Sequence, residues 1–332
     1  MAETGNIAAM AETLSSDLFS EFFWERAGPM NHNWDCMKPE VHEVKTHPSD
    51  VVFYYDEPYT QQRTFLQCDL KSYARGSIVL PKLKGALESL AKQVACAEVS
   101  EEWQNLYVHK GQTPAIAGLL FVYNHDGEYD KDFSDNLKAL QTANLDIPRG
   151  SKLVVLGPED IYWLDNVRYE IVQMRGRRSG SRLPDPQHCK YYYPQLTRKK
   201  NLQMDKAKAA TLEMLTSKLI VLEYLSPDAP GKRGLVLFYR GKGESSDEFT
   251  YLFDYLRHYQ LLEKDVSVEI KMFDASAHAK PMFQKAVQSY IEGLAEGAQL
   301  TSLAQRVEEI QFSSISQVRT RFSQIEIGMD YE

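Results

Sequence analysis

Two aspartates and a lysine in segment 47–78 have residue types and a spacing that suit divalent-metal chemistry. The segment has the pattern of a two-stranded hairpin, with Asp50 at the start of the first strand and Asp69 and Lys71 two positions apart on the second. Because strand side chains alternate between faces, Gln67, Asp69 and Lys71 are expected on one side of the sheet. Two carboxylates at a sheet edge can hold a hard cation, and a nearby ammonium can orient a water molecule. The spacing predicts metal-assisted hydrolysis of a phosphodiester.

The acid–any–lysine pattern is weak alone, because it occurs three times, at 43–45, 69–71 and 269–271. Only the middle copy has a second acid on a neighbouring strand, since the turn at 56–62 returns the chain past Asp50. A long helix is expected before 269–271, and the residues upstream of 43–45 have a loop-like composition. The sequence therefore favours 69–71.

Hydrophobic periodicity predicts an alternation of helices and strands on both sides of this hairpin. Expected helices are 14–26, one that follows Pro81, 133–142, 205–218 (continuing into the apolar run 219–225), 247–262 and 281–294; expected strands, besides the hairpin, are 40–47, 117–124, 152–157, 234–241 and 266–273. This order indicates an α/β layer fold. No convincing sequence repeat relates the two halves.

With these parts in order, the N-terminal half resembles the PD-(D/E)XK nuclease superfamily. The resemblance depends on the helix that carries Glu21, segment 48–50, triplet 69–71, the helix after Pro81 and strand 117–124. It implies a restriction-endonuclease-like mixed sheet flanked by helices, followed here by a second α/β domain. Two features depart from the family pattern: Ser49 separates the proline from the first acid, and the second acid is Asp rather than the commoner Glu.

The resemblance also implies a role for each matching position. Asp50, Asp69 and the Leu70 carbonyl would ligate Mg²⁺ (or Mn²⁺), with Glu21 as the helical acid that assists the metal. Lys71 would orient or help deprotonate the attacking water, and Gln67 would support the site from behind or touch substrate.

Structural interpretations of the same residues remain open. Asp50 follows Pro48 and can be an ordinary turn residue. Asp69 and Lys71 can be a solvated strand face, and Glu21 can be a helix-edge acid. Asp56 rivals Asp50, but as the end of the same strand it should lie further from Asp69.

A change in composition at 175–186, rich in Arg, Gly, Ser and Pro, divides the chain. We expect a nuclease-like core at 1–174, a basic linker or loop at 175–200 and an α/β assembly or partner-binding domain at 201–332. The linker offers candidate phosphate contacts, or else a solvated basic loop. The candidate nucleic-acid-binding residues are Arg175, Arg177, Arg178, Arg182, Arg198, Lys199 and Lys200.

Composition and short motifs argue against several classes of protein and kinds of site. The net charge of −8 argues against a protein that coats nucleic acid generally. No apolar run approaches a membrane span and no secretory signal is recognisable, so a cytoplasmic protein is expected. Four widely spaced cysteines without a CxxC pair predict reduced thiols and no cysteine zinc site. The eight histidines show no HExxH spacing, and P-loop, G-x-S-x-G and dinucleotide motifs are absent.

These observations favour a Mg²⁺-dependent nuclease that acts on DNA, as a homo-oligomer or with a second subunit. Analogy suggests a bacterial restriction or antiphage defence complex. One alternative is a scaffold subunit that keeps the nuclease fold without catalysis. Another α/β enzyme would need a different site, for example around the acidic loop 125–130.

Overall fold

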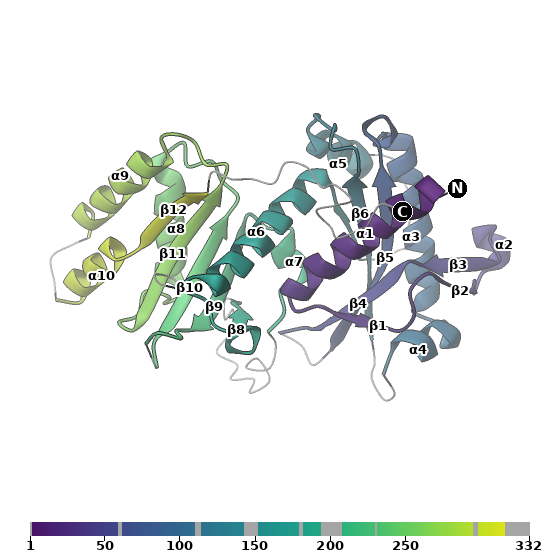
Figure 1. The fold of residues 1–332 in the computed structure, drawn as a ribbon, viewed down its shortest axis with the longest axis horizontal. Coiled ribbons are helices and arrows are strands. Elements are labelled where there is room, and N and C mark those ends of the chain that lie inside the picture. The colour runs from purple at the N-terminus through teal and green to yellow at the C-terminus, as the bar shows by residue number, and fades with distance from the viewer. Residues whose placement is uncertain are drawn as a thin grey trace. The chain divides into compact units, whose positions relative to one another are not determined.

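The computed structural model describes residues 2–58, 62–109, 114–142, 152–178, 182–193, 208–229, 231–294 and 298–315. The described residues form two compact units, one reaching to Asp165 and the other beginning at Asn166 (Figure 1). Each unit has its own five-stranded sheet flanked by helices. The predicted α/β fold with a second α/β domain is therefore confirmed.

The first sheet has the order β1-β4-β5-β6-β7. Its strands are β1 (Glu25–Ala27), β4 (Val51–Asp56), β5 (Arg63–Tyr73), β6 (Ala115–Asn124) and β7 (Leu153–Leu156). β1, β4 and β5 pair antiparallel, whereas β5, β6 and β7 are parallel to one another. The predicted hairpin is thus β4–β5, placed centrally in a mixed sheet.

Helices cover both faces of this sheet. Helix α1 (Ala2–Glu21) packs on one face, where the ring of Phe19 contacts those of Phe53 and Phe121. Helix α3 (Leu80–Ala97) packs on the other with the predicted apolar stripe, and Pro81 occupies its first turn. Helix α3 lies so close to β6 that a Cβ at Gly118 would lie 2.9 Å from a methyl carbon of Val94.

Three shorter helices complete the first unit. They are α2 (Pro39–His42), α4 (Glu101–Tyr107) and α5 (Phe133–Thr142). Segment 40–47 is not one strand as predicted, since Pro39 at the first helical position starts a helical turn that Glu43 ends in the left-handed conformation. The strands there are β2 (His32–Asp35) and β3 (Thr46–Ser49), which form a separate antiparallel pair.

The second sheet has the order β12-β11-β10-β9-β8. Its strands are β8 (Cys189–Tyr191), β9 (Leu219–Leu225), β10 (Arg233–Tyr239), β11 (Val266–Phe273) and β12 (Gln311–Ile315). Helices α8 (Ser246–His258) and α9 (Ala279–Glu292) bury Phe249, Phe253 and Phe283 in a core that includes residues of β10 and β11. Helix α10 (Ala298–Glu308) precedes β12.

Two expectations for this half need correction. The run 219–225 is strand β9 rather than the end of a helix, and the described part of 205–218 contains only α7 (Leu212–Leu215). An apolar run of seven residues suits either structure on pattern alone, and here pairing with β10 decides. Helix α6 (Pro158–Gly176) escaped prediction because polar Asp165, Asn166 and Glu170 are buried along it.

The two sheets share one topology. In each, reading from one edge, two antiparallel pairings are followed by two parallel ones, with β9, β10, β11 and β12 in the places of β4, β5, β6 and β7. A helix also precedes each sheet along the chain, α1 before the first and α6 before the second. The fold therefore repeats where the sequence shows no repeat.

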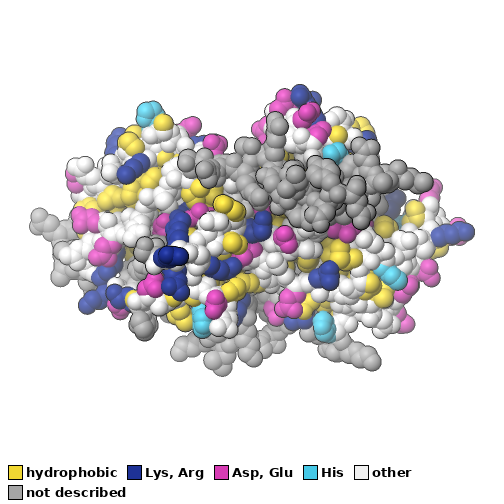
Figure 2. Space-filling model, viewed as in Figure 1, with side chains coloured by type: hydrophobic (Ala, Val, Ile, Leu, Met, Phe, Trp, Pro, Cys, Tyr) yellow, Lys and Arg dark blue, Asp and Glu magenta, His cyan; other side chains and the backbone are white. Residues whose placement is uncertain are grey.

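Among the described residues, no helix is long and apolar enough to cross a membrane. On the face that Figure 2 shows, acidic and basic side chains are interspersed.

Candidate active site

The β4–β5 register brings Asp50 and Asp69 together. Val51 pairs with Cys68, and the same register continued by one residue sets Asp50 opposite Asp69. Opposed residues of an antiparallel pair place their Cβ atoms about 4.5–5.5 Å apart on one face. The backbone N–H of Leu70 donates to Oδ2 of Asp50 at 2.7 Å, which fixes that carboxylate against β5.

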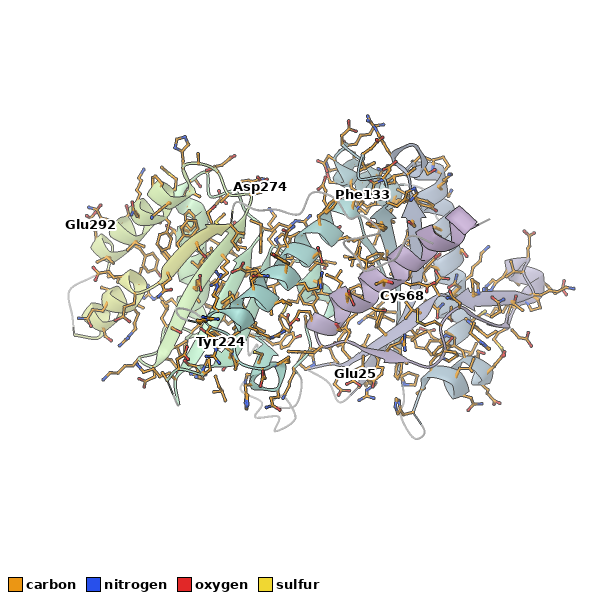
Figure 3. The ribbon with its side chains drawn as sticks, viewed as in Figure 1. Glu25, Cys68, Phe133, Tyr224, Asp274 and Glu292 are labelled. Atoms are coloured by element: carbon orange, nitrogen blue, oxygen red, sulfur yellow. The ribbon has the colours of Figure 1, made fainter. Side chains whose placement is uncertain are left out.

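Period-two alternation places the other residues of β5 as predicted. Gln67, Asp69 and Lys71 share a face, and Cys68 lies on the opposite face, buried beside helix α1 (Figure 3). Asp69 is 4% exposed, and Lys71 is partly exposed at the end of the strand. Asp69 is therefore buried, whereas Lys71 remains in contact with solvent.

The Lys71 ammonium forms a close ion pair with Oδ1 of Asp69. Burial works to lower the pKa of Lys71, but the charges of Asp69 and Asp50 outweigh it and raise the pKa above its ordinary value. The side chain is therefore a cation at neutral pH. It can donate to a water or a phosphate oxygen.

The Asp50 carboxyl is in an environment that disfavours its charge. Burial, followed by the adjacent charge of Asp69, raises the pKa of Asp50 from 3.8 to about 6, against the opposing effects of the Leu70 N–H and Lys71. Two close carboxylates with one ammonium leave an excess negative charge in a poorly solvated place. A divalent cation would neutralise that excess, so the donor set fits a hard metal such as Mg²⁺.

Gln67 lies behind the acids and joins four segments. Its fully buried amide accepts from the Ser49 hydroxyl at 2.9 Å and from the Trp103 indole at 3.0 Å. It donates to the Pro48 carbonyl at 3.0 Å and to Gln93 at 2.9 Å. All its hydrogen-bonding atoms are engaged within the protein, and two of these bonds hold the segment before Asp50.

Glu21 and Glu12 occupy different places on helix α1. Glu21 is the last residue of the helix, and the neighbouring Trp24 ring stacks on Tyr55, near the far end of β4 from Asp50. Glu12, nine residues earlier, accepts from the side chain of Asn31 at 2.9 Å, and the N–H of Asn31 donates to the Asp50 carbonyl. The structure therefore links Glu12 to the Asp50 segment. Sequence periodicity had no means to identify this acid.

The rival acid Asp56 lies at the opposite end of β4 from Asp50. Its carboxylate pairs with Arg63 at 2.8 Å and is 61% exposed. The same strand thus separates the two aspartates by its full length, as the sequence predicted.

The described part of the basic segment is partly used within the second unit. Arg177 forms an ion pair with the buried Glu170 at 2.5 Å, and Arg182 lies 3.6 Å from Asp228. Arg178 is exposed, and Arg175 is half-buried near the end of α6. The remaining candidates, Arg198, Lys199 and Lys200, lie outside the described residues.

The triplet 269–271 is a buried ionic cluster on β11. Lys271 is 1% exposed and pairs with Glu269 at 2.6 Å and with Glu170 of α6 at 3.0 Å. Ser313 accepts from Lys271 and donates to Glu269. The positive charge of Lys271 therefore compensates the negative charges of Glu269 and Glu170 inside the protein.

The acidic loop 125–130 is a hydrogen-bonded turn. Asp126 accepts from the N–H groups of Arg75 and Glu128 and from the side chain of Asn124. Burial works to raise the pKa of Asp126, but these donors outweigh it and lower the pKa. The carboxylate is committed to the turn, as expected of a loop.

One buried cluster could not be predicted from the cysteine spacing. Cys36, His42, His47 and Cys96 are all buried, and one ligand atom from each lies within 4.8 Å of the others. Burial, with smaller contributions from His42 and Lys92, lowers the pKa of His47 to about 4, so its ring is neutral. No local spacing reveals the cluster, because Cys96 comes from helix α3, sixty residues after Cys36.

Residues 1–160 match the family model described as the GAPS4 protein PD-(D/E)XK nuclease domain. The resemblance predicted from the sequence is therefore confirmed for this part of the chain, which is a little under half of it. The match indicates a nuclease-type function. No curated protein and no solved structure matches the chain.

Proposed function

We propose that the first unit is a Mg²⁺- or Mn²⁺-dependent nuclease that hydrolyses phosphodiester bonds of DNA. The observation that carries this proposal is the convergence of Asp50, Asp69 and Lys71 on one face of adjacent strands. The matched nuclease-domain family supports the same reaction class.

In this proposal the chain supplies positioning and charge. Asp50, Asp69 and the Leu70 carbonyl hold the metal, which when bound stabilises charge developing on the phosphate and lowers the pKa of a water. Lys71 donates to the attacking water or to a phosphate oxygen and keeps that water in line. The Leu70 N–H holds Asp50 in its ligating orientation before metal arrives.

The proposal also covers DNA contacts, the role of the second unit and the complex in which the protein acts. The exposed Arg178 and the residues Arg198, Lys199 and Lys200 are the candidates for backbone phosphate contacts. The second unit serves in self-association or in docking a second subunit, because the places of Asp50 and Asp69 in its sheet carry no acid. A cytoplasmic restriction or antiphage defence complex is the setting that this architecture suggests by analogy.

The alternative is a non-catalytic scaffold with a nuclease fold. One observation favours it, and that observation concerns only the second unit. Its β10, which has the place of β5, reads RGLVLFY and contains no acid. The first unit retains both acids and the lysine, so the scaffold role belongs to the second unit.

The test is cleavage of plasmid and linear DNA with Mg²⁺ or Mn²⁺ by wild type, Asp69→Asn and Lys71→Ala. We expect both variants to lose about 100-fold or more of the rate. Asp56→Asn is the matched control, since it removes an acid from the same strand at its far end, and it should cut normally.

Cleavage that persists in both site variants would overturn the assignment of the site. A wild type that cuts no DNA with either metal, alone or with its co-expressed partner, would favour the scaffold alternative for the whole chain.

A further inference from the structure

The buried Cys36–His42–His47–Cys96 cluster has the dimensions of a tetrahedral metal site. The two sulfur atoms lie 3.9 Å apart, and Nδ1 of His42 lies 3.4 Å from each of them. Zinc bonds of about 2.3 Å to sulfur and 2.0–2.1 Å to nitrogen put neighbouring ligand atoms of a tetrahedron about 3.3–3.8 Å apart. The ligand atoms therefore surround a space of the right size.

His47 supplies an independent sign that a ligand is expected there. Its Nε2 atom is buried and has no hydrogen-bond partner, although the side chain is only 3% exposed. A buried polar atom without a partner costs free energy, and such atoms are rare in native proteins. A bound cation would satisfy it.

The elements that carry the four residues need a crosslink. Three of the residues belong to the β2–α2–β3 segment, and Cys96 comes from helix α3. The sheet of this segment has only two strands of four residues each, and an isolated pair of strands is marginally stable in water. A metal bound by all four would fasten the segment to the main helix of the unit.

We propose that Cys36, His42, His47 and Cys96 bind one structural Zn²⁺ ion. Thiolate and imidazole ligands select zinc over Mg²⁺, which prefers oxygen, and four protein ligands leave no open position for catalysis. The N–H of Lys38 already points at Cys36 Sγ at 3.4 Å, as an N–H donor does to a metal-bound thiolate. The ion differs in chemistry and place from the metal proposed at Asp50 and Asp69.

The zinc site stands close to the candidate active site along the chain. His47 is on β3, which ends at Ser49, the residue before Asp50 and a hydrogen-bond partner of Gln67. Zinc would therefore hold the strand that delivers Asp50. This consequence, unlike zinc binding itself, rests on the proposed nuclease function.

The first experiment measures zinc in the purified full-length wild type by elemental analysis, without chelators at any step. We expect about one zinc ion per chain. Replacement of zinc by Co²⁺ should give the intense visible bands of a tetrahedral site and a sulfur-to-cobalt charge-transfer band. A chain that neither contains zinc nor takes up Co²⁺ would overturn the proposal, as would a Cys36–Cys96 disulfide found by mass in its place.

Variants then locate the ion. Cys36→Ser and Cys96→Ser should retain less than about one-tenth of the zinc and unfold at a Tm lower by about 10 °C. Cys189→Ser is the matched control, because it removes a buried thiol from the second unit, and it should keep zinc and Tm. If a cysteine variant does not fold, the wild-type zinc content and Co²⁺ spectrum still decide.

Asp69→Asn separates this proposal from the proposed function. That variant should keep its zinc while losing cleavage. Zinc lost with Asp69→Asn but kept by Cys36→Ser would place the ion at the acids and overturn the cysteine–histidine site. If the wild type contains zinc but cuts no DNA, the proposed zinc site is supported and only the proposed nuclease function is contradicted.

Discussion

At the residue scale, the charge on Asp50 opposes folding until a cation is bound. Its pKa is raised to about 6 in the folded protein by burial and by Asp69, against 3.8 in an unfolded chain. Protonation therefore stabilises the fold fully below about pH 4, and this stabilisation is lost as the pH rises through 6. Above pH 6 the carboxylate is charged in both states and destabilises the metal-free fold.

Asp50→Asn should accordingly raise the stability of the metal-free protein above pH 6. We expect a gain of about 1–3 kcal/mol near neutral pH that shrinks as the pH falls through 6 and vanishes only well below 3.8, where the wild-type carboxyl is protonated in both states. Thermal unfolding of both proteins over this pH range, in buffer without divalent metal or chelator, measures the gap. Adding Mg²⁺ should narrow it by stabilising the wild type. A gap that does not change with pH would show that the charge of Asp50 is not its source.

Two glutamates on helix α1 compete for the role of the helical acid. Glu12 reaches the Asp50 carbonyl through Asn31, whereas Glu21 ends the helix about 13 Å further along its axis. Glu12→Gln keeps a hydrogen-bond acceptor for Asn31 but removes the charge. We expect it to lower cleavage about 10-fold, with Glu21→Gln within about twofold of wild type.

The measurement is the cleavage rate as a function of Mg²⁺ concentration. A charge effect at the site should appear as a higher metal requirement for Glu12→Gln. The reverse ranking of the two variants would return the role to Glu21.

At the scale of elements, a single glutamine fixes the geometry of the hairpin. Gln67 on β5 joins Pro48 and Ser49 of β3, Gln93 of α3 and Trp103 of α4 by four hydrogen bonds, three of them fully buried. Gln67→Leu keeps the volume but leaves these partners without their bonds. We expect a loss of about 2–4 kcal/mol of stability and a lower cleavage rate at temperatures where the variant is folded.

Denaturant unfolding checks the first effect, and cleavage kinetics the second. Gln93→Leu is the control, because it removes only one of the four bonds of Gln67 and should cost less on both counts. Wild-type stability in Gln67→Leu would mean that the network does not hold the strands.

What the sequence could predict at this scale follows from the range of each interaction. Asp69 and Lys71 share a face because alternation is local, and Asp50 joins them through a turn only a few residues long. Cys96 reaches Cys36 through tertiary packing of α3, which no spacing rule describes. The same holds for Glu12, whose link to Asp50 passes through Asn31. The sequence therefore predicts the arrangement within the hairpin, and not the contacts that a separate element supplies.

At the scale of the whole molecule, one topology is used twice with different chemistry. β5 of the first unit carries Asp69 and Lys71, whereas the equivalent β10 contains no acid. The acid–any–lysine triplet of the second unit lies on β11, at Glu269 and Lys271. The sequence could not reveal this repetition, because the sheet order depends on pairings between distant strands and not on shared residues. Burial distinguishes the two triplets, because the Lys271 side chain is 1% exposed and that of Lys71 is 31% exposed.

Lys271→Met tests that separation. The substitution keeps an unbranched side chain but leaves Glu269, and part of the charge of Glu170, buried without the lysine. Breaking a buried ionic cluster by removing one partner costs about 3–5 kcal/mol, so a large fall in Tm is expected. The proposed nuclease site lies in the other unit, so the cleavage rate below the new Tm should equal that of wild type. Differential scanning calorimetry and cleavage kinetics on the same preparation check both.

Lys71→Met is the natural comparison, since it removes the lysine of the other triplet. The Lys71 side chain is 31% exposed, so its loss should lower Tm less than the loss of Lys271, while cleavage falls about 100-fold or more. The two variants should therefore differ, with the larger loss of stability in Lys271→Met and the loss of catalysis in Lys71→Met. A folded Lys271→Met protein without activity would instead make the buried cluster part of the reaction and assign catalysis to the second unit as well. The expected result, with stability lost in Lys271→Met and cleavage lost in Lys71→Met, would show that the same topology serves catalysis in the first unit and a structural role in the second.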